Sequence, residues 1–363
     1  MPRRMLAAAA LAALAAGAAA CAGSSATSTR HRTHTAPAQV SPAESVMGTL
    51  LAPPDRSFLA RVRAGKMGGV LLLGNGWTSR STVATVTAEL QRAACTRGEP
   101  LLVGADQEGG IVRRLPWVAP TVAPSQMTSP AEAHSQAAAA AKGLRAVGVD
   151  VDFAPVVDTP TSNANFLGSR AFSHSASWNV RMARAFVQGL QSNGIAATAK
   201  HFPGLGAAGA NTDLSRVVIH ASAATLRSGL KPFQAAVRAG VKLVMVSTAI
   251  YPALDPSRQP AAFSKTLIGG ILRQQLGFEG VTVTDSLTVP AAASVYHAAT
   301  KAVAAGSDLL LFGDEAASER AYTTLGSDAA KYPRLRAQLA QAATRIEALK
   351  AWLAARGGPS CPG

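Results

Sequence analysis

Short apolar runs rich in Val and Leu alternate with helix-like segments from Val46 to the end of the chain. Apolar runs of this length, separated by helical patterns, are typical of repeated βα units around a parallel sheet. The pattern predicts eight strands, at residues 47–51, 69–73, 101–105, 149–155, 196–201, 243–247, 281–284 and 308–312.

The segments between the runs carry helix signals. Ser129-Pro130-Ala131-Glu132 is a capping box with Pro at the first helical position, and it predicts a helix that ends near Gly148. Further helices are predicted over 179–192, 223–238 and 334–356. No glycine-rich phosphate turn follows the first strand, so we expect an α/β fold with a single (β/α)8 barrel of the TIM type rather than a doubly wound sheet.

The start of the chain has the pattern of an export signal. Arg3 and Arg4 are followed by an apolar run that ends at Cys21 and is too short to span a membrane with its flanks. Residues 1–20 are therefore predicted to be a signal peptide. Three alanines before Cys21 resemble a bacterial lipoprotein cleavage site, so we expect Cys21 to carry lipid; plain secretion with an incidental cysteine is the alternative.

The next stretch is rich in Ser, Thr, Ala, His and Pro and has no apolar period. Residues 21–45 are predicted to be the lipidated cysteine and a flexible tether, and residues 46–358 the barrel domain. These predictions place the protein outside the cytoplasm, anchored to the cell membrane through the lipid.

Cysteine count and charge exclude other classes of protein. Three cysteines without a Cys-x-x-Cys pair argue against a zinc finger or a disulfide scaffold. If Cys21 is lipidated, Cys95 and Cys361 could form a disulfide between the C-terminal tail and an early helix; two unpaired thiols are the alternative. The 35 Lys and Arg against 20 Asp and Glu give +15, but they are spread along the chain and aromatics are only 5%. We therefore expect a basic surface and no nucleic-acid partner.

The reacting groups of such a barrel lie at the C-terminal ends of the strands and in the loops that follow. These positions are polar, and they hold Asp106, Glu108, Asp158, Lys200, His201, Ser247, Thr248 and Asp285. Asp285 could attack an anomeric carbon or simply cap the next helix. Lys200 and His201 could donate hydrogen bonds to sugar hydroxyls. No cluster has the spacing of metal ligands, so neither a metal nor another cofactor is expected.

Five motifs in this order resemble those of glycoside hydrolase family 3, in its single-domain β-N-acetylhexosaminidase (NagZ-type) branch. The resemblance spans roughly residues 46–315 and rests on Asp106-Gln107-Glu108-Gly109-Gly110, residues 152–158, residues 168–172, Lys200-His201-Phe202-Pro203-Gly204 and Thr284-Asp285-Ser286-Leu287.

The resemblance implies a retaining exo-glycosidase with Asp285 as its nucleophile. It also implies that the terminal sugar is held by Asp106, Arg114, Arg170, Lys200 and His201. For the two arginines, a surface position or a carboxylate partner is the alternative. The expected substrate is a carbohydrate, terminal β-linked N-acetylglucosamine on cell-wall fragments, and the expected state is a monomer. A β-glucosidase of the same family is the alternative enzyme.

The chain departs from this branch in the loop after Gly204. Asp213 matches the Asp of the branch's Asp-Ser-His motif, but Ser215 stands where we expect its acid/base His; Ile111 and Thr248 replace a usual Arg and His. Asp213 could act as the acid/base instead. Alternatively, His220 or an external anion such as phosphate could act, or the protein could bind sugar without turnover. The small residues of 205–215 predict a mobile loop that closes over the sugar.

Overall fold

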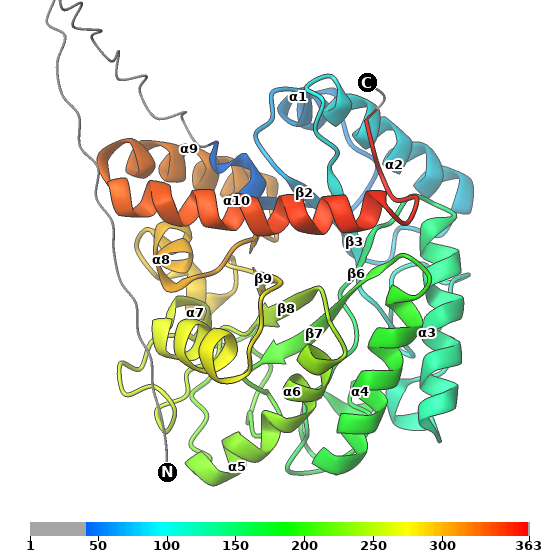
Figure 1. Cartoon of the computed structure of the whole chain (residues 1–363), viewed down its shortest axis with the longest axis vertical. Coiled ribbons are helices and arrows are strands. Elements are labelled where there is room, and N and C mark those ends of the chain that lie inside the picture. The colour runs from blue at the N-terminus through cyan, green and yellow to red at the C-terminus, as the bar shows by residue number, and fades with distance from the viewer. Residues whose placement is uncertain (1–40, 362–363) are drawn as a thin grey trace, which may run out of the picture. The chain divides into compact units, whose positions relative to one another are not determined.

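The computed structural model describes residues 41–361 (Figure 1). Its main sheet has eight strands in the order β10-β1-β2-β3-β6-β7-β8-β9, with every pairing parallel. The strands are β1 (Val46–Leu50), β2 (Gly69–Leu72), β3 (Leu102–Ala105), β6 (Val151–Asp152), β7 (Ala196–Phe202), β8 (Leu243–Val246), β9 (Val281–Thr284) and β10 (Leu310–Leu311). A parallel bridge between Val283 and Leu309 joins the two edges. The predicted barrel is confirmed.

Helices surround this barrel. They are α1 (Arg56–Arg63), α2 (Arg80–Cys95), α3 (Pro130–Arg145), α4 (Ala176–Gln191), α5 (Ala223–Gly229), α6 (Lys231–Arg238), the π-helix η5 (Thr266–Gln275), α7 (Pro290–Ala293), α8 (Ala298–Ala305), α9 (Glu315–Lys331) and α10 (Pro333–Ala354). Six begin at a Ser or Asp whose side chain accepts a hydrogen bond from the first turn: Asp55, Ser79, Ser129, Ser175, Ser222 and Asp314.

The single helix predicted over residues 223–238 is wrong. The structure has two helices there, α5 and α6, which meet at Leu230. Pro232 lies in the first turn of α6, where its missing N–H costs nothing, whereas inside a continuous helix it would remove a backbone hydrogen bond. The proline therefore begins a second helix.

Alternate strand residues fill the barrel interior. Its buried apolar cluster includes Met47, Leu71, Leu102, Val151, Phe153, Ala196, Leu243, Met245, Val281, Val283, Leu309 and Leu311. The residues between them on the strands, such as Val244, pack outward against the helices. Since side chains alternate with a period of two, Asp285 continues the inward row of Val281 and Val283, and Lys200 that of Ala196. The strands thus direct both polar side chains to the barrel mouth.

Helix α10 closes the opposite end of the barrel. Its side chains Ile346, Leu349 and Leu353 belong to the same buried cluster as the inward strand residues. Trp352 lies beside Lys242, which directly precedes β8, with 5.0 Å between the ammonium and the indole centre. In Figure 1 this helix, drawn in red, crosses in front of the strands. The interior is therefore a packed core with one open end.

Residues 42–45, predicted to belong to the tether, are instead part of the folded domain. Pro42–Ser45 form a 3-10 helix in which Pro42, Ala43 and Ser45 are buried. The Lys350 ammonium on α10 lies 2.6 Å from a Glu44 carboxylate oxygen. This ion pair joins the beginning of the domain to its last helix. The predicted signal peptide and Cys21 lie outside the described residues.

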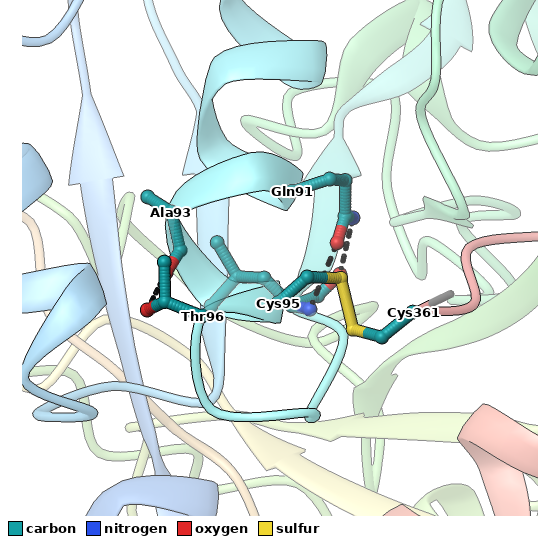
Figure 2. The surroundings of a disulfide bond; sticks show 6 residues. Gln91, Ala93, Cys95, Thr96 and Cys361 are labelled. Carbon is teal, nitrogen blue, oxygen red and sulfur yellow. Dashed lines mark hydrogen bonds between the residues drawn. A yellow bond between two sulfur atoms is a disulfide. The ribbon is translucent and has the colours of Figure 1, made fainter. Parts of the chain in front are cut away.

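Cys95 and Cys361 form a disulfide, the pairing expected from the sequence (Figure 2). Cys95 is the last residue of α2, so the bond attaches the C-terminal tail to an early helix. Beside it, Gln91 bonds to both backbone groups of Leu101 at the approach to β3. In residues 41–361, no helix has the length and apolar character needed to cross a membrane.

Candidate active site

A cavity of about 280 Å³ lies at the C-terminal ends of the strands. Its floor is apolar and includes Leu71, Phe153, Met245 and Leu311 of the barrel interior. The structure brings all seven predicted site residues together in its lining: Asp106, Arg114, Arg170, Lys200, His201, Asp213 and Asp285. Polar groups thus surround the opening above an apolar base.

One side of the cavity holds a network of ion pairs centred on Lys200. The Lys200 ammonium lies 2.6 Å from an Asp106 oxygen and 2.7 Å from a Glu108 oxygen. Arg170 donates two hydrogen bonds of 2.8 Å to the two oxygens of Glu108. Burial acts to raise the pKa of Glu108, but Lys200 and Arg170 outweigh it and lower the pKa to about 2. The network is therefore charged and fixed before any ligand binds.

Arg114 reaches this network through a β-hairpin that the sequence analysis did not predict. Strands β4 (Gln107–Gly109) and β5 (Val112–Arg113) pair antiparallel across Gly110. Gly109 has a φ of +102°, and a Cβ there would lie 2.5 Å from a backbone oxygen, so glycine is required. The hairpin brings the Arg114 Nε to 3.8 Å from an Asp106 oxygen. A Gly-Gly pair between short polar segments was the signal for this turn.

Ile111 lies at the tip of the hairpin and is 77% exposed. It does not line the cavity, whereas its neighbour Val112 does. The residue that replaces the expected arginine is therefore outside the site.

His201 is held by Asp158, which lies beneath it. The His201 Nδ1 is 2.8 Å from an Asp158 oxygen. The same carboxylate accepts hydrogen bonds from the backbone N–H of His201 and of Leu205, at 3.2 and 2.7 Å. Asp158 is fully buried, so it fixes the ring with its Nε2 edge available to a ligand.

Asp285 follows β9 directly, and its position is set by the backbone. Its N–H donates to the Val246 oxygen at 2.8 Å, and its Oδ1 accepts from the Ser286 N–H at 2.8 Å. Burial raises the pKa of Asp285; the charge of His201 opposes this shift and that of Asp213 adds to it. The alternative role as a helix cap is wrong, because α7 begins at Pro290 with Val289 as its N-cap.

The loop after Gly204 has two parts. Residues 205–208 are pinned, because the Asn165 amide donates to the carbonyls of Leu205, Gly206 and Ala208 at 2.9–3.2 Å. A Cβ on Gly206 would lie 1.8 Å from the Thr159 oxygen, so this part packs closely. The expectation of a loop with little to hold it was therefore wrong for these residues.

The second part of the loop brings Asp213 to the cavity. Asn211, Thr212 and Asp213 all line it, and the Asp213 N–H donates to the Asn211 side chain at 3.0 Å. Ser215 occupies the sequence position where a histidine was expected, and it does not line the cavity. Its hydroxyl donates to the Asn211 backbone oxygen at 3.4 Å. His220 is exposed and also outside the lining.

Two further polar strand ends do not belong to the cavity. Ser247 shares a hydrogen bond of 2.9 Å with Tyr251, and Thr248 is buried with no hydrogen-bond partner for its hydroxyl among the described residues. Three further residues line the cavity without having been expected from the sequence: Thr49, Phe166 and Asn211. Thr49 follows Met47 by two positions, so the inward alternation of β1 was the available signal.

Comparison with known proteins agrees with this geometry. Residues 47–349 match the model of the glycosyl hydrolase family 3 N-terminal domain. The chain is 32% identical over 280 residues to a β-hexosaminidase of Nitrosomonas eutropha, covering 73% of this chain and 78% of that protein. It is 37% identical over 284 residues to a β-hexosaminidase of Xanthomonas oryzae pv. oryzae, covering 73% and 81%.

Solved structures show the same relationship. A β-N-acetylhexosaminidase from Beutenbergia cavernae superposes with a TM-score of 0.80 at 31% identity, covering 88% of this chain and 98% of that one. A family 3 β-N-acetylglucosaminidase from Paenibacillus sp. superposes with a TM-score of 0.81 at 30% identity, and the match covers 90% of this chain and 64% of that longer one. The chain therefore belongs to glycosyl hydrolase family 3 and is a glycoside hydrolase.

Proposed function

We propose that the protein is a retaining exo-acting β-N-acetylglucosaminidase whose nucleophile is Asp285. The observation that carries this proposal is the position of Asp285, a carboxylate without an ion-pair partner in residues 41–361, in the wall of a cavity of about 280 Å³. A cavity of this size suits one terminal sugar rather than a long chain.

The reaction needs a nucleophile and a proton donor. An oxygen of Asp285 attacks the anomeric carbon and forms a glycosyl ester, while the bond to the leaving oxygen breaks and that oxygen takes a proton. Asp213 supplies the proton in our proposal, because it lines the same cavity and interacts electrostatically with Asp285. It then accepts a proton from the water that hydrolyses the ester, which restores both carboxyl groups.

The ion-pair network positions the sugar. Asp106 and Arg114 present an acceptor and donors at one side of the cavity, and His201 presents Nε2 at another. Because Lys200 already fixes Asp106 and Asp158 already fixes His201, sugar hydroxyls meet polar atoms that do not need to reorganise. The network therefore supplies orientation, and the two aspartates supply the chemistry.

The substrate and location are also proposals. The similar proteins described above are β-hexosaminidases and β-N-acetylglucosaminidases, which supports N-acetylglucosamine as the terminal sugar. We propose cell-wall fragments as the source of this sugar and lipid on Cys21 as the membrane anchor, because the apolar start of the sequence indicates export. A net charge of +15 suits a protein that works at an anionic cell envelope.

An activity comparison tests the proposed function. We expect the full-length protein to release the aryl group from an aryl β-N-acetylglucosaminide faster than from the matching aryl β-glucoside. Faster release from the glucoside would contradict the proposed sugar. Saturable binding of N-acetylglucosamine with no product after long incubation would instead favour a sugar-binding protein without turnover.

Replacing Asp213 tests the proposed acid/base. We expect Asp213→Ala to lose most activity on substrates with poor leaving groups and much less on activated aryl glycosides, which need little protonation. Added azide should restore turnover and give a glycosyl azide. Ser215→Ala is the matched control, since Ser215 lies in the same loop but outside the cavity lining. Equal losses on both substrates without azide rescue would show that Asp213 is structural.

A further inference from the structure

A second, larger cavity lies next to the catalytic one. Its volume is about 570 Å³, and it is bounded by the loop after Asp285, the beginning of α8 and the first turns of α9. These helices lie together on one side of the barrel (Figure 1). Two short segments separate the cavities. Ser286 and Gly313 line the catalytic one, and their chain neighbours Leu287, Thr288, Phe312 and Asp314 line the second.

The wall between the cavities is one layer of chain. The Leu287 N–H donates to the Leu311 oxygen at 2.8 Å, and the Gly313 N–H donates to the Thr288 hydroxyl at 3.2 Å. The second cavity is therefore separate from the catalytic one and lies on the other face of this layer.

An exposed aromatic platform borders the second cavity. Tyr296 is 79% exposed, and its ring centre lies 4.1 Å from that of His297. The His297 Nδ1 is 2.8 Å from an Asp328 oxygen that also accepts from the Thr300 hydroxyl at 2.6 Å. Since Asp328 is buried in α9, it holds the imidazole, and the imidazole supports the tyrosine ring. The Tyr296 side chain is thus held in place at the surface, although it packs into no hydrophobic core.

Two charged side chains complete the lining. Arg320 and Asp314 both belong to it, and neither has an ion-pair partner within residues 41–361. An aromatic face suits the C–H side of a sugar ring, and adjacent donors and acceptors suit its hydroxyl groups. A flat aromatic with flanking polar groups beside a roomy cavity therefore has the chemistry of a carbohydrate site.

We propose that this second cavity binds an amino-sugar oligosaccharide independently of the catalytic cavity, with Tyr296 as the stacking platform and Arg320 and Asp314 as hydrogen-bonding groups. The identity of the ligand class rests on the proposed function, because a glycan-cleaving enzyme meets glycan chains. Binding here raises the local concentration of chain ends at the catalytic opening, since a tethered chain re-enters without a new encounter.

The test uses the full-length protein with Asp285→Asn, so that the probe is not consumed, and chitotetraose as the probe in calorimetry. We expect chitotetraose to bind the Asp285→Asn protein at two sites. After the further change Tyr296→Ala, we expect either one site or an affinity at the weaker site that is about tenfold lower than before. Tyr296→Phe should restore it. Tyr332→Ala is the matched control, because Tyr332 is also an exposed tyrosine, at 57%, but lies outside this cavity.

A single binding site with and without Tyr296, or an equal loss in Tyr332→Ala, would overturn the proposal. With active Asp285, Tyr296→Ala should hydrolyse an aryl β-N-acetylglucosaminide at the parental rate, which shows that the variant folds. Failure of the proposed function would appear separately, as absence of aryl glycoside hydrolysis by the parent. Tyr296-dependent chitotetraose binding would then still support the second site.

Discussion

Each end of the barrel contains a buried carboxylate, but the two carboxylates differ in their partners. At the open end, Glu108 is 1% exposed and is held by Lys200 and Arg170, which lower its pKa to about 2. At the closed end, Asp150 is 5% exposed and has one hydrogen bond, from the Val103 N–H at 3.2 Å. Burial there raises the pKa of Asp150 to about 8. Neighbouring cations, and not the depth of burial, therefore determine the charge state of these two carboxylates.

This difference between the two carboxylates matches the structural role of each end of the barrel. The open end must hold a polar ligand, so it keeps paired charges whose orientation is fixed. At the closed end, α10 fills the barrel with apolar side chains such as Leu349. Where charge is kept near this end, as at Asp308, two arginines pair with it: Arg273 at 2.5 Å and Arg345 at 2.9 Å. Asp150 lacks such a partner among the described residues.

The largest expected effect of a charge removal is at Asp285. Asp285→Asn keeps the shape and removes the nucleophile, so kcat on aryl glycosides should fall by about three to five orders of magnitude. The same change at the other end, Asp150→Asn, should leave kcat unchanged. A fluorinated activated sugar should label Asp285 in the parent protein, as read by peptide mapping. Label on another residue would show that the assignment to β9 is wrong.

The next effect concerns the charge network of the open end. Glu108→Gln leaves Lys200 and Arg170 buried with one carboxylate fewer. We expect this change to lower the free energy of unfolding by about 3–5 kcal/mol and to lower kcat/KM at least about a hundredfold. Because the pKa of Glu108 is lowered in the folded state, its stabilisation is present above about pH 4 and is lost as the pH falls toward 2. Denaturant unfolding of both proteins across this range measures the difference.

Glu319→Gln is the control for that experiment. Glu319 also contacts two cations, Arg61 and Lys66, but its side chain is 36% exposed, so its loss should cost about 1 kcal/mol or less. Similar losses in the two variants would mean that burial adds nothing to the Glu108 network.

The smallest effect is expected at Asp150, and it has the opposite sign. Its raised pKa means that the folded state binds a proton that the unfolded state releases above about pH 4, so stability falls as the pH rises from about 4 to 8. Asp150→Asn keeps the acceptor for Val103 and removes this loss. We expect the variant to be about 2–4 kcal/mol more stable than the parent at pH 8 and nearly equal at pH 4. A parallel pH dependence of the two proteins would contradict this explanation.

The fold could be predicted because barrels repeat a local pattern. Apolar runs located all eight strands, although β6 and β10 are shorter than the runs predicted. The position of α10 could not be derived, since an amphipathic pattern shows that a helix has a buried face but not what covers it. The break at Leu230 was not predicted, because the prediction of one helix rested on the terminating Gly240, whereas Pro232 in the first turn of α6 begins a second helix.

The positions of candidate site residues follow more directly from the sequence on strands than on loops. The inward alternation of β7 and β9 fixes Lys200 and Asp285 from local sequence alone. The role of Asn165, which pins the loop of Asp213 from forty residues earlier in the chain, depends on a tertiary contact that no spacing reveals. The same holds for Asp158, whose contact with His201 determines the orientation of the ring.

The pairing of β1 with β10 has a consequence for how the protein folds during its synthesis. Val46 and Met47 lie beside Leu310 and Leu311, Glu44 pairs with Lys350, and Cys95 is bonded to Cys361. Strand β1 thus gains its second neighbour only after synthesis has passed β10. A nascent chain that ends before β10 lacks the closing strand, helix α10 and the disulfide-bonded tail at once. Synthesis must therefore have passed β10, α10 and Cys361 before the barrel can close with all of these contacts.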